Sequence, residues 1–195
     1  PADIAATDPF AASACGVRTR VSGSADGLSI GLCPGAEYGE AKRWPLDRYA
    51  ETVLEVQARL SSETEPRPCD WRIFGSPKEA ALAAELADAI AAVEPTNRAG
   101  KTSIQELGDE LAACDLVLTN DTGTMHLAAA LGVPTVAIFG STEPAWTAPL
   151  GSGHHVIRRH VECSPCFLRE CPRDYRCMNE IDTSTVVEVI METLT

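Results

Sequence analysis

Residues 116–139 read LVLTNDTGTMHLAAALGVPTVAIF, and this stretch decides the fold class. An apolar run (116–118) leads into a polar turn, which is followed by a segment of small residues (127–132) and a second apolar run (135–139). We interpret this order as strand, turn, helix and strand. The free N–H groups and the positive dipole end at a helix N-terminus favour an anion. The stretch therefore predicts a phosphate-binding turn at the carboxyl end of a parallel strand.

The side chains of this turn allow two interpretations. Gly123 permits close approach of a ligand to the backbone, and Thr122, Thr124 and His126 can add hydrogen-bond donors. Alternatively, Asp121 or Thr122 is only the N-cap of the helix, and His126 is a packed or surface histidine. Because open α/β sheets bind their ligands at this edge, we favour the ligand interpretation for the turn as a whole.

Strand and helix patterns alternate along residues 27–195, which we expect to form one domain. Residues 1–26 are rich in Ala, Ser and Asp and are expected to be a lead-in or interdomain segment with a weak helix over 4–14. The repeated strand–helix units predict a doubly wound parallel α/β sheet. Strands are expected at 28–33, 70–74, 96–99, 116–119, 135–139 and 156–157, and helices at 46–60, 76–93, 103–114 and 182–194, besides the helix after the turn.

Composition restricts the classes of partner. The net charge of -12 over 195 residues argues against nucleic acid as the main partner. A hydrophobic content of 45% and a charged content of 23% are typical of a soluble globular protein. Two basic islands, at 42–43 and 158–176, suit a phosphate-bearing small ligand or an anionic acceptor, although either can be an ordinary solvated surface.

The loop after the first domain strand, residues 34–45, reads PGAEYGEAKRWP. Its two glycines allow close approach to a ligand, and Lys42 supplies a positive charge for a diphosphate. Since this loop and the Asp121 turn both follow parallel strands, they should meet at one sheet edge and act as a clamp. A proline-bearing loop over 141–153 is expected to shape the same site. The spacing fits neither the P-loop nor the G-x-G-x-x-G pattern, which disfavours an ATPase or a dehydrogenase.

Four segments in this order, at 34–45, 74–76, 99–103 and 120–126, closely resemble the carboxyl-terminal half of glycosyltransferase family nine, the ADP-heptose:lipopolysaccharide heptosyltransferases. The first of these segments is most similar to the heptosyltransferase II branch. The resemblance covers about residues 28–194. It implies a Rossmann-like, carboxyl-terminal domain of a two-domain GT-B glycosyltransferase, in which this half binds the nucleotide sugar and the other half binds the acceptor.

The resemblance also implies the ligand and its contacts. The donor would be ADP-heptose and the acceptor the inner core of lipopolysaccharide, with inverting transfer that requires no metal. The donor diphosphate would be held by Lys42 and by Asp121, Thr122, Gly123 and His126. Glu79 is the counterpart of a glutamate that contacts the ribose, or it only completes the capping box that begins at Ser76. The resemblance implies a cytoplasmic protein and leaves peripheral membrane association of the full-length protein open.

No catalytic residue is expected in this chain, because the family's general base is an aspartate in the acceptor domain. The chain alone is therefore not expected to transfer sugar. Two alternatives stay open: another family-nine enzyme with a different acceptor or sugar, and a non-catalytic nucleotide-binding module.

The eight cysteines divide into two groups. Those at 15, 33, 69 and 114 are scattered and are expected to be small core residues. The other four lie within fifteen residues, with a spacing that can hold a tetrahedral zinc, although free thiols or disulfides are alternatives: Cys163, Cys166, Cys171 and Cys177. We expect this segment to be structural, because it follows the last core strand and is distant in sequence from both phosphate loops.

Overall fold

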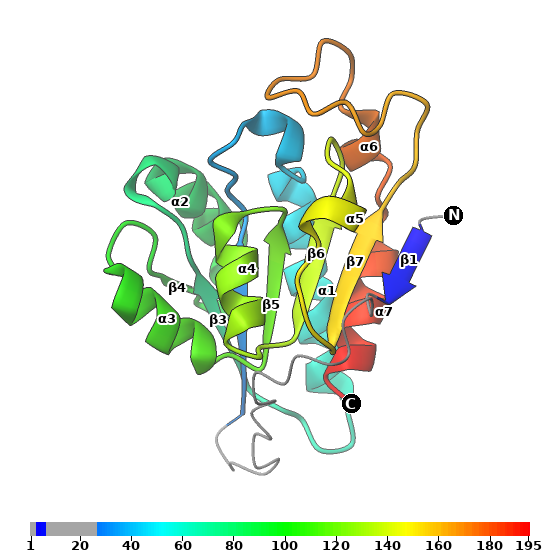
Figure 1. The fold of residues 1–195 in the computed structure, drawn as a ribbon. Coiled ribbons are helices and arrows are strands. Elements are labelled where there is room, and N and C mark those ends of the chain that lie inside the picture. Colours follow the sequence, from blue (N-terminus) through cyan, green and yellow to red (C-terminus); the bar gives the residue numbers. More distant parts are fainter. Residues whose placement is uncertain (1–2, 7–26) are drawn as a thin grey trace.

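The computed structural model describes the backbone of residues 3–6 and the whole of residues 27–195. The strands among them form one sheet in the order β1-β7-β6-β5-β2-β3-β4 (Figure 1). All neighbours pair in parallel except β1, which runs antiparallel along the edge strand β7. The strands are β1 (Asp3–Ala6), β2 (Leu28–Cys33), β3 (Cys69–Ile73), β4 (Thr96–Asn97), β5 (Leu116–Asn120), β6 (Thr135–Phe139) and β7 (His154–Arg158).

Helices cover both faces of the sheet, which confirms the predicted doubly wound α/β fold (Figure 1). One face carries α1 (Leu46–Ser62), α2 (Ala80–Ala89) and α7 (Thr183–Thr193). The other carries α3 (Ile104–Ala112) and α4 (Gly123–Ala130). Because successive side chains of a strand point to opposite faces, Leu116 and Leu118 pack in the first core and Val117 in the second. Every residue of β5 and β6 is buried, as expected for parallel strands covered on both sides.

The strand order places a topological switch point between β2 and β5. From β2 the chain moves outward to β3 and β4, and it then returns to the other side of β2 to form β5, β6 and β7. The helical connections that follow β2 and β5 therefore diverge, which opens a crevice at the carboxyl ends of these two strands. The loop over 34–45 and the Asp121 turn both leave the sheet at this crevice.

Several predicted elements need correction. Residues 4–6, the start of the expected weak helix, belong to β1 instead, because the edge strand β7 offers backbone groups that pair with them. The remainder of that expected helix, and Cys15, lie outside the described residues. The helix predicted over 76–93 is divided into a 3₁₀ turn (Pro77–Glu79), α2 and a second 3₁₀ turn (Ala91–Val93).

Two four-residue helices were not predicted: α5 (Pro144–Thr147) and α6 (Arg176–Asn179). Both lie in connections near the carboxyl edge of the sheet, as does a 3₁₀ turn over Glu40–Lys42 (Figure 1). Cys33 and Cys114 are buried as expected, whereas Cys69 is only half-buried. None of the described helices has the length and apolar character needed to cross a membrane.

Candidate functional site

An ion pair joins the two predicted phosphate loops at the switch point. Lys42 ends the 3₁₀ turn in the loop after β2, and Asp121 directly follows β5. The Lys42 Nζ lies 2.6 Å from the Asp121 Oδ2, and the exposed fractions of the two side chains are only 12% and 4%. The predicted meeting of these loops at one edge of the sheet is confirmed.

Asp121 is the centre of a larger set of contacts. Besides Lys42, its Oδ2 accepts hydrogen bonds from the Thr142 Oγ1 at 2.7 Å and the Thr147 Oγ1 at 3.5 Å. Both threonines belong to the loop after β6, which was predicted to shape the site. A carboxylate repels a phosphate, so Asp121 is suited to orient Lys42 and these hydroxyls rather than to contact an anion itself.

Asn120 was quoted in the sequence motif but not predicted as a site residue. Its Nδ2 donates to the Pro34 carbonyl at 2.8 Å and to the Gly35 carbonyl at 3.2 Å, and its Oδ1 accepts from the Trp44 N–H at 3.1 Å. This fully buried amide therefore ties both ends of the 34–45 loop to the end of β5. The available signal was an amide side chain at the end of a strand predicted to be buried, because a buried amide needs hydrogen-bond partners.

At the start of α4, one residue caps the helix and two others are exposed. Thr122 is the N-cap, and its Oγ1 accepts from the Met125 N–H at 3.5 Å, so the capping interpretation is confirmed for Thr122. Gly123 is exposed, and no heavy atom lies within 4 Å of the position a Cβ would occupy. His126 is an exposed residue of the first turn. The helix N-terminus thus presents free space beside its first N–H groups, where an anion is favoured.

A pocket of about 340 Å³ opens next to this helix start, within the size range of small-molecule sites. Four segments and the end of β2 contribute to it: the 34–45 loop, the turn after β3, the start of α3 and the start of α4. Its lining residues are Cys33, Gly35, Glu37, Phe74, Gly75, Ser76, Pro77, Glu79, Thr102, Ser103, Ile104, Leu107, Thr122, Gly123 and Thr124. The structure therefore brings Glu79, Thr122 and Gly123 to one pocket, whereas His126 is not among its lining residues.

Glu79 lies between the pocket and its own helix start. Its Oε2 accepts from the Ser76 N–H at 2.7 Å and from the Ser76 Oγ at 2.9 Å, which confirms the capping box. The carboxylate also packs against Gly35, where a Cβ would overlap it. Glycine at this position is what allows the 34–45 loop and Glu79 to share the pocket wall. Contact of Glu79 with a ribose stays a prediction.

The four clustered cysteines lie in the connection between β7 and α6 and on α6 itself, and all are free thiols. The pKa of the Cys177 thiol is raised to about 11, mainly by burial and further by Cys166, Cys163 and Cys171 nearby. The four thiols therefore share one neighbourhood. Within residues 27–195, however, no three His, Cys, Asp or Glu side chains are arranged to hold a metal ion as they stand. The zinc site stays a prediction.

The cysteine segment, residues 159–177, is close in space to a phosphate loop from which it is distant in sequence. The Ala41 N–H donates to the Arg169 carbonyl at 3.0 Å, and the Tyr38 hydroxyl donates to the Phe167 carbonyl at 2.8 Å. These contacts hold the loop on which Lys42 lies. Separation along the chain was therefore a poor guide to the segment's position.

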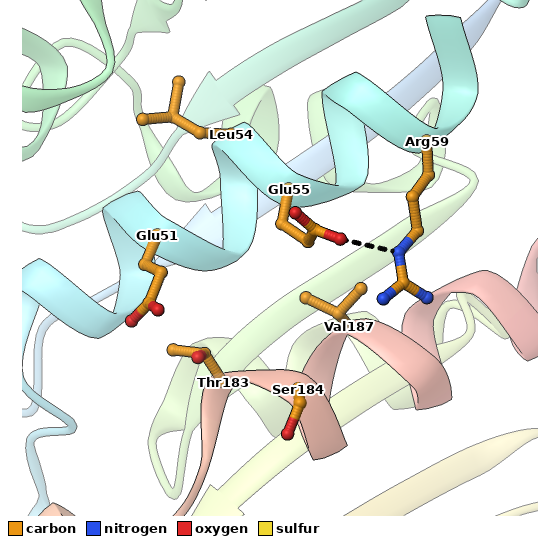
Figure 2. A pocket seen from close by; sticks show the side chains of 7 residues that line it. All are labelled: Glu51, Leu54, Glu55, Arg59, Thr183, Ser184 and Val187. Atoms are coloured by element: carbon orange, nitrogen blue, oxygen red, sulfur yellow. Dashed lines mark hydrogen bonds and ion pairs between the residues drawn. The ribbon is translucent and has the colours of Figure 1, made fainter. Parts of the chain in front are cut away.

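A second hollow, of about 420 Å³, lies between α1 and α7 (Figure 2). Figure 2 shows an ion pair between Glu55 and Arg59 across one turn of α1. The Arg59 Nε lies 2.9 Å from the Glu55 Oε1. Glu51 adds a further carboxylate to its wall. None of the residues predicted to bind the donor lines this hollow, and the one cation among the described residues of its wall, Arg59, is already paired with Glu55.

Residues 5–175 match the model of glycosyltransferase family 9 (heptosyltransferase). The chain is 34% identical over 164 residues to lipooligosaccharide heptosyltransferase 2 of Campylobacter jejuni, which covers 82% of this chain and 49% of that protein. The structure of E. coli ADP-heptose lps heptosyltransferase II matches with a TM-score of 0.70 and 32% identity over 89% of this chain and 48% of that one.

A more distant structure, E. coli heptosyltransferase WaaC with ADP-2-deoxy-2-fluoro heptose, has the same fold, with a TM-score of 0.60 and 21% identity over 87% of this chain and 44% of that one. The chain thus spans about half the length of the relatives it matches. These matches confirm the expected Rossmann-like half of a GT-B glycosyltransferase.

Proposed function

Because the chain belongs to glycosyltransferase family 9, the heptosyltransferases, we propose that it forms the donor-binding part of an enzyme that transfers heptose from ADP-heptose to the inner core of lipopolysaccharide. The Lys42–Asp121 pair supports this proposal most strongly. It puts an oriented ammonium group beside the open start of α4, at the switch point where α/β sheets bind nucleotides.

In this proposal, the nucleoside occupies the 340 Å³ pocket and the diphosphate lies between Lys42 and the N-terminus of α4. Lys42 supplies a localised positive charge, and Asp121 keeps it directed at the crevice. The N–H groups beside Gly123 supply further donors without a side chain in the way. These contacts would bind ADP and the ADP part of the donor alike.

The proposed reaction is an inverting substitution that needs no metal. An acceptor hydroxyl attacks the anomeric carbon of heptose, the bond from that carbon to the distal phosphate oxygen breaks, and ADP leaves. The hydroxyl proton passes to a general base, which we propose to lie in an acceptor-binding part outside residues 27–195. Lys42 and the α4 N-terminus would stabilise the negative charge that develops on the leaving diphosphate.

Titration calorimetry of the 195-residue chain with ADP and with AMP tests the donor-binding proposal. We expect ADP to bind and AMP to bind at least about tenfold more weakly, because AMP lacks the outer phosphate and its charge-assisted hydrogen bonds. Failure to bind ADP, or equal affinity for the two nucleotides, would contradict the proposal.

A further inference from the structure

Three exposed aromatic side chains lie around the Lys42–Asp121 pair, each from a different segment. Tyr38 belongs to the loop after β2, Trp146 to α5, and Phe167 to the cysteine segment. Their exposed fractions are 39%, 75% and 38%. We call these three residues the aromatic rim. Large apolar groups gathered at an exposed site commonly mark a binding surface rather than a packing need.

Contacts connect the aromatic rim to the ion pair at both ends. The rings of Trp146 and Phe167 are stacked, with centroids 5.1 Å apart and an interplanar angle of 17°. The Phe167 carbonyl accepts the Tyr38 hydroxyl, and the Lys42 Nζ lies 4.9 Å from the centroid of the Tyr38 ring. At the other end, the residue after Trp146 is Thr147, whose hydroxyl reaches Asp121.

Along the sheet edge, Trp146 and Phe167 lie on the opposite side of the ion pair from the 340 Å³ pocket, whereas Tyr38 lies on the loop that carries Lys42. The pocket extends from β2 toward the turn after β3 and the start of α3. Trp146 follows β6 and Phe167 follows β7, which are on the other side of the switch point. The order along the edge is therefore the pocket, then the Lys42–Asp121 pair with Tyr38 beside it, and then Phe167 and Trp146.

That order matches the order of parts in a nucleotide sugar. The sugar is bonded directly to the distal phosphate, so a diphosphate at Lys42 leaves the sugar on the side away from the nucleoside. The C–H face of a sugar ring packs against an aromatic ring, while its hydroxyls keep their hydrogen bonds. Arg169, whose guanidinium carbon lies 4.9 Å from the Tyr38 centroid, adds hydrogen-bond donors at the same surface.

We propose that the aromatic rim is the subsite for the sugar ring of the donor, with Trp146 as its main contact. This proposal rests on the proposed donor-binding function and assigns its sugar-binding residues. The proposal predicts different behaviour for two ligands. ADP has no sugar on its distal phosphate and does not reach the rim, whereas a nucleotide diphosphate sugar does.

Calorimetry of the Trp146→Ala chain with ADP-heptose and with ADP tests the subsite. We expect the affinity for ADP-heptose to fall by about three- to tenfold, the effect of one lost aromatic contact, and the affinity for ADP to stay within about twofold. Trp146→Phe should retain most of the ADP-heptose affinity. Leu150→Ala is the matched control, because Leu150 is 68% exposed on the same loop but outside the rim, and it should change neither affinity.

An equal loss of affinity for both ligands, with an unchanged melting temperature, would overturn the subsite and place Trp146 in support of the diphosphate clamp through Thr147. An unchanged affinity for both ligands would also overturn the subsite. The rim would then be available to bind another partner, such as an acceptor. If the parent chain fails to bind ADP at all, the proposed function itself fails, and this outcome is distinct from both others.

Discussion

Asn120 and Asp121 are neighbours at the end of β5, and their side chains have different roles. The Asn120 amide binds backbone groups of the 34–45 loop, whereas the Asp121 carboxylate binds the Lys42 ammonium and two hydroxyls. The amide is neutral and can be buried with all its bonds made. The carboxylate needs a cation nearby, since an unpaired buried charge costs several kcal/mol.

We predict that Lys42→Ala weakens ADP binding by about 1–3 kcal/mol, the range for losing a hydrogen bond to a charged group. Asp121→Ala should weaken it by a similar amount, because Lys42 then loses its orientation. If the two residues act as one unit, the double variant loses little more than the larger single loss. Calorimetry with ADP measures all three values.

Arg59→Ala is the charge-matched control, since Arg59 pairs with Glu55 on α1 and lies at the hollow of Figure 2. It should leave ADP affinity unchanged. The assignment of Lys42 is wrong if the folded Lys42→Ala chain binds ADP as tightly as the parent does.

At the scale of elements, the predictable parts were those with long or repeated local signals. The apolar strands β2, β5 and β6, the small-residue helix α4 and the Ser103 capping box of α3 all have such signals in sequence. By contrast, α5 and α6 are four residues long, which is too short for helical periodicity. The four residues of β1 become a strand only by pairing with β7, about 150 positions along the chain.

The candidate site was predictable to the same extent. Lys42 and Asp121 follow separate strands, so the parallel topology was enough to bring them to one edge. Thr147, Phe167 and Trp146 could not be placed, because their positions depend on how irregular connections pack against one another. Such packing leaves no periodic pattern in the sequence.

Gly35 gives a test of the loop that Asn120 anchors. We predict that Gly35→Ala lowers the free energy of unfolding by about 1–3 kcal/mol, because the added methyl overlaps the Glu79 carboxylate and must displace it or the loop. ADP affinity should fall with it. Gly108→Ala is the matched control, since Gly108 lies inside α3 with nothing within 4 Å of its Cβ position. That variant should be neutral or more stable by up to about 1 kcal/mol. Denaturant titration measures both, and equal stability of the two variants would contradict the predicted overlap.

The cysteine segment gives a second test at this scale. If its four thiols bind structural zinc, elemental analysis should find about one metal per chain and a chelator should lower the melting temperature. A metal-free chain that is indifferent to the chelator would show the zinc prediction to be wrong.

Cys163→Ser separates a structural role from a role at the site. If the segment is purely structural, the Cys163→Ser variant should have a lower free energy of unfolding, and its folded form should still bind ADP. Loss of ADP binding with an unchanged circular dichroism spectrum would contradict a purely structural role. The contacts of Phe167 and Arg169 with the loop that carries Lys42 would then explain how the segment affects ADP binding.

At the scale of the whole molecule, the chain spans about half the length of its relatives. We predict that the 195-residue chain binds ADP-heptose without transferring heptose, because the proposed general base must face the anomeric carbon from the side opposite the diphosphate. A transfer assay with a lipopolysaccharide inner-core acceptor checks this. Robust heptose transfer by the purified chain would contradict the proposal that the general base lies outside residues 27–195.

The central claim is that the edge between β2 and β5 holds the donor diphosphate, and a crystal structure of the chain with ADP tests it most directly. The expected result has the phosphate oxygens within hydrogen-bond distance of the Lys42 Nζ and of the N–H groups at the start of α4, with the nucleoside in the pocket beside Gly35. ADP bound in the hollow between α1 and α7, or bound at the edge with its phosphates turned away from Lys42, would contradict the claim.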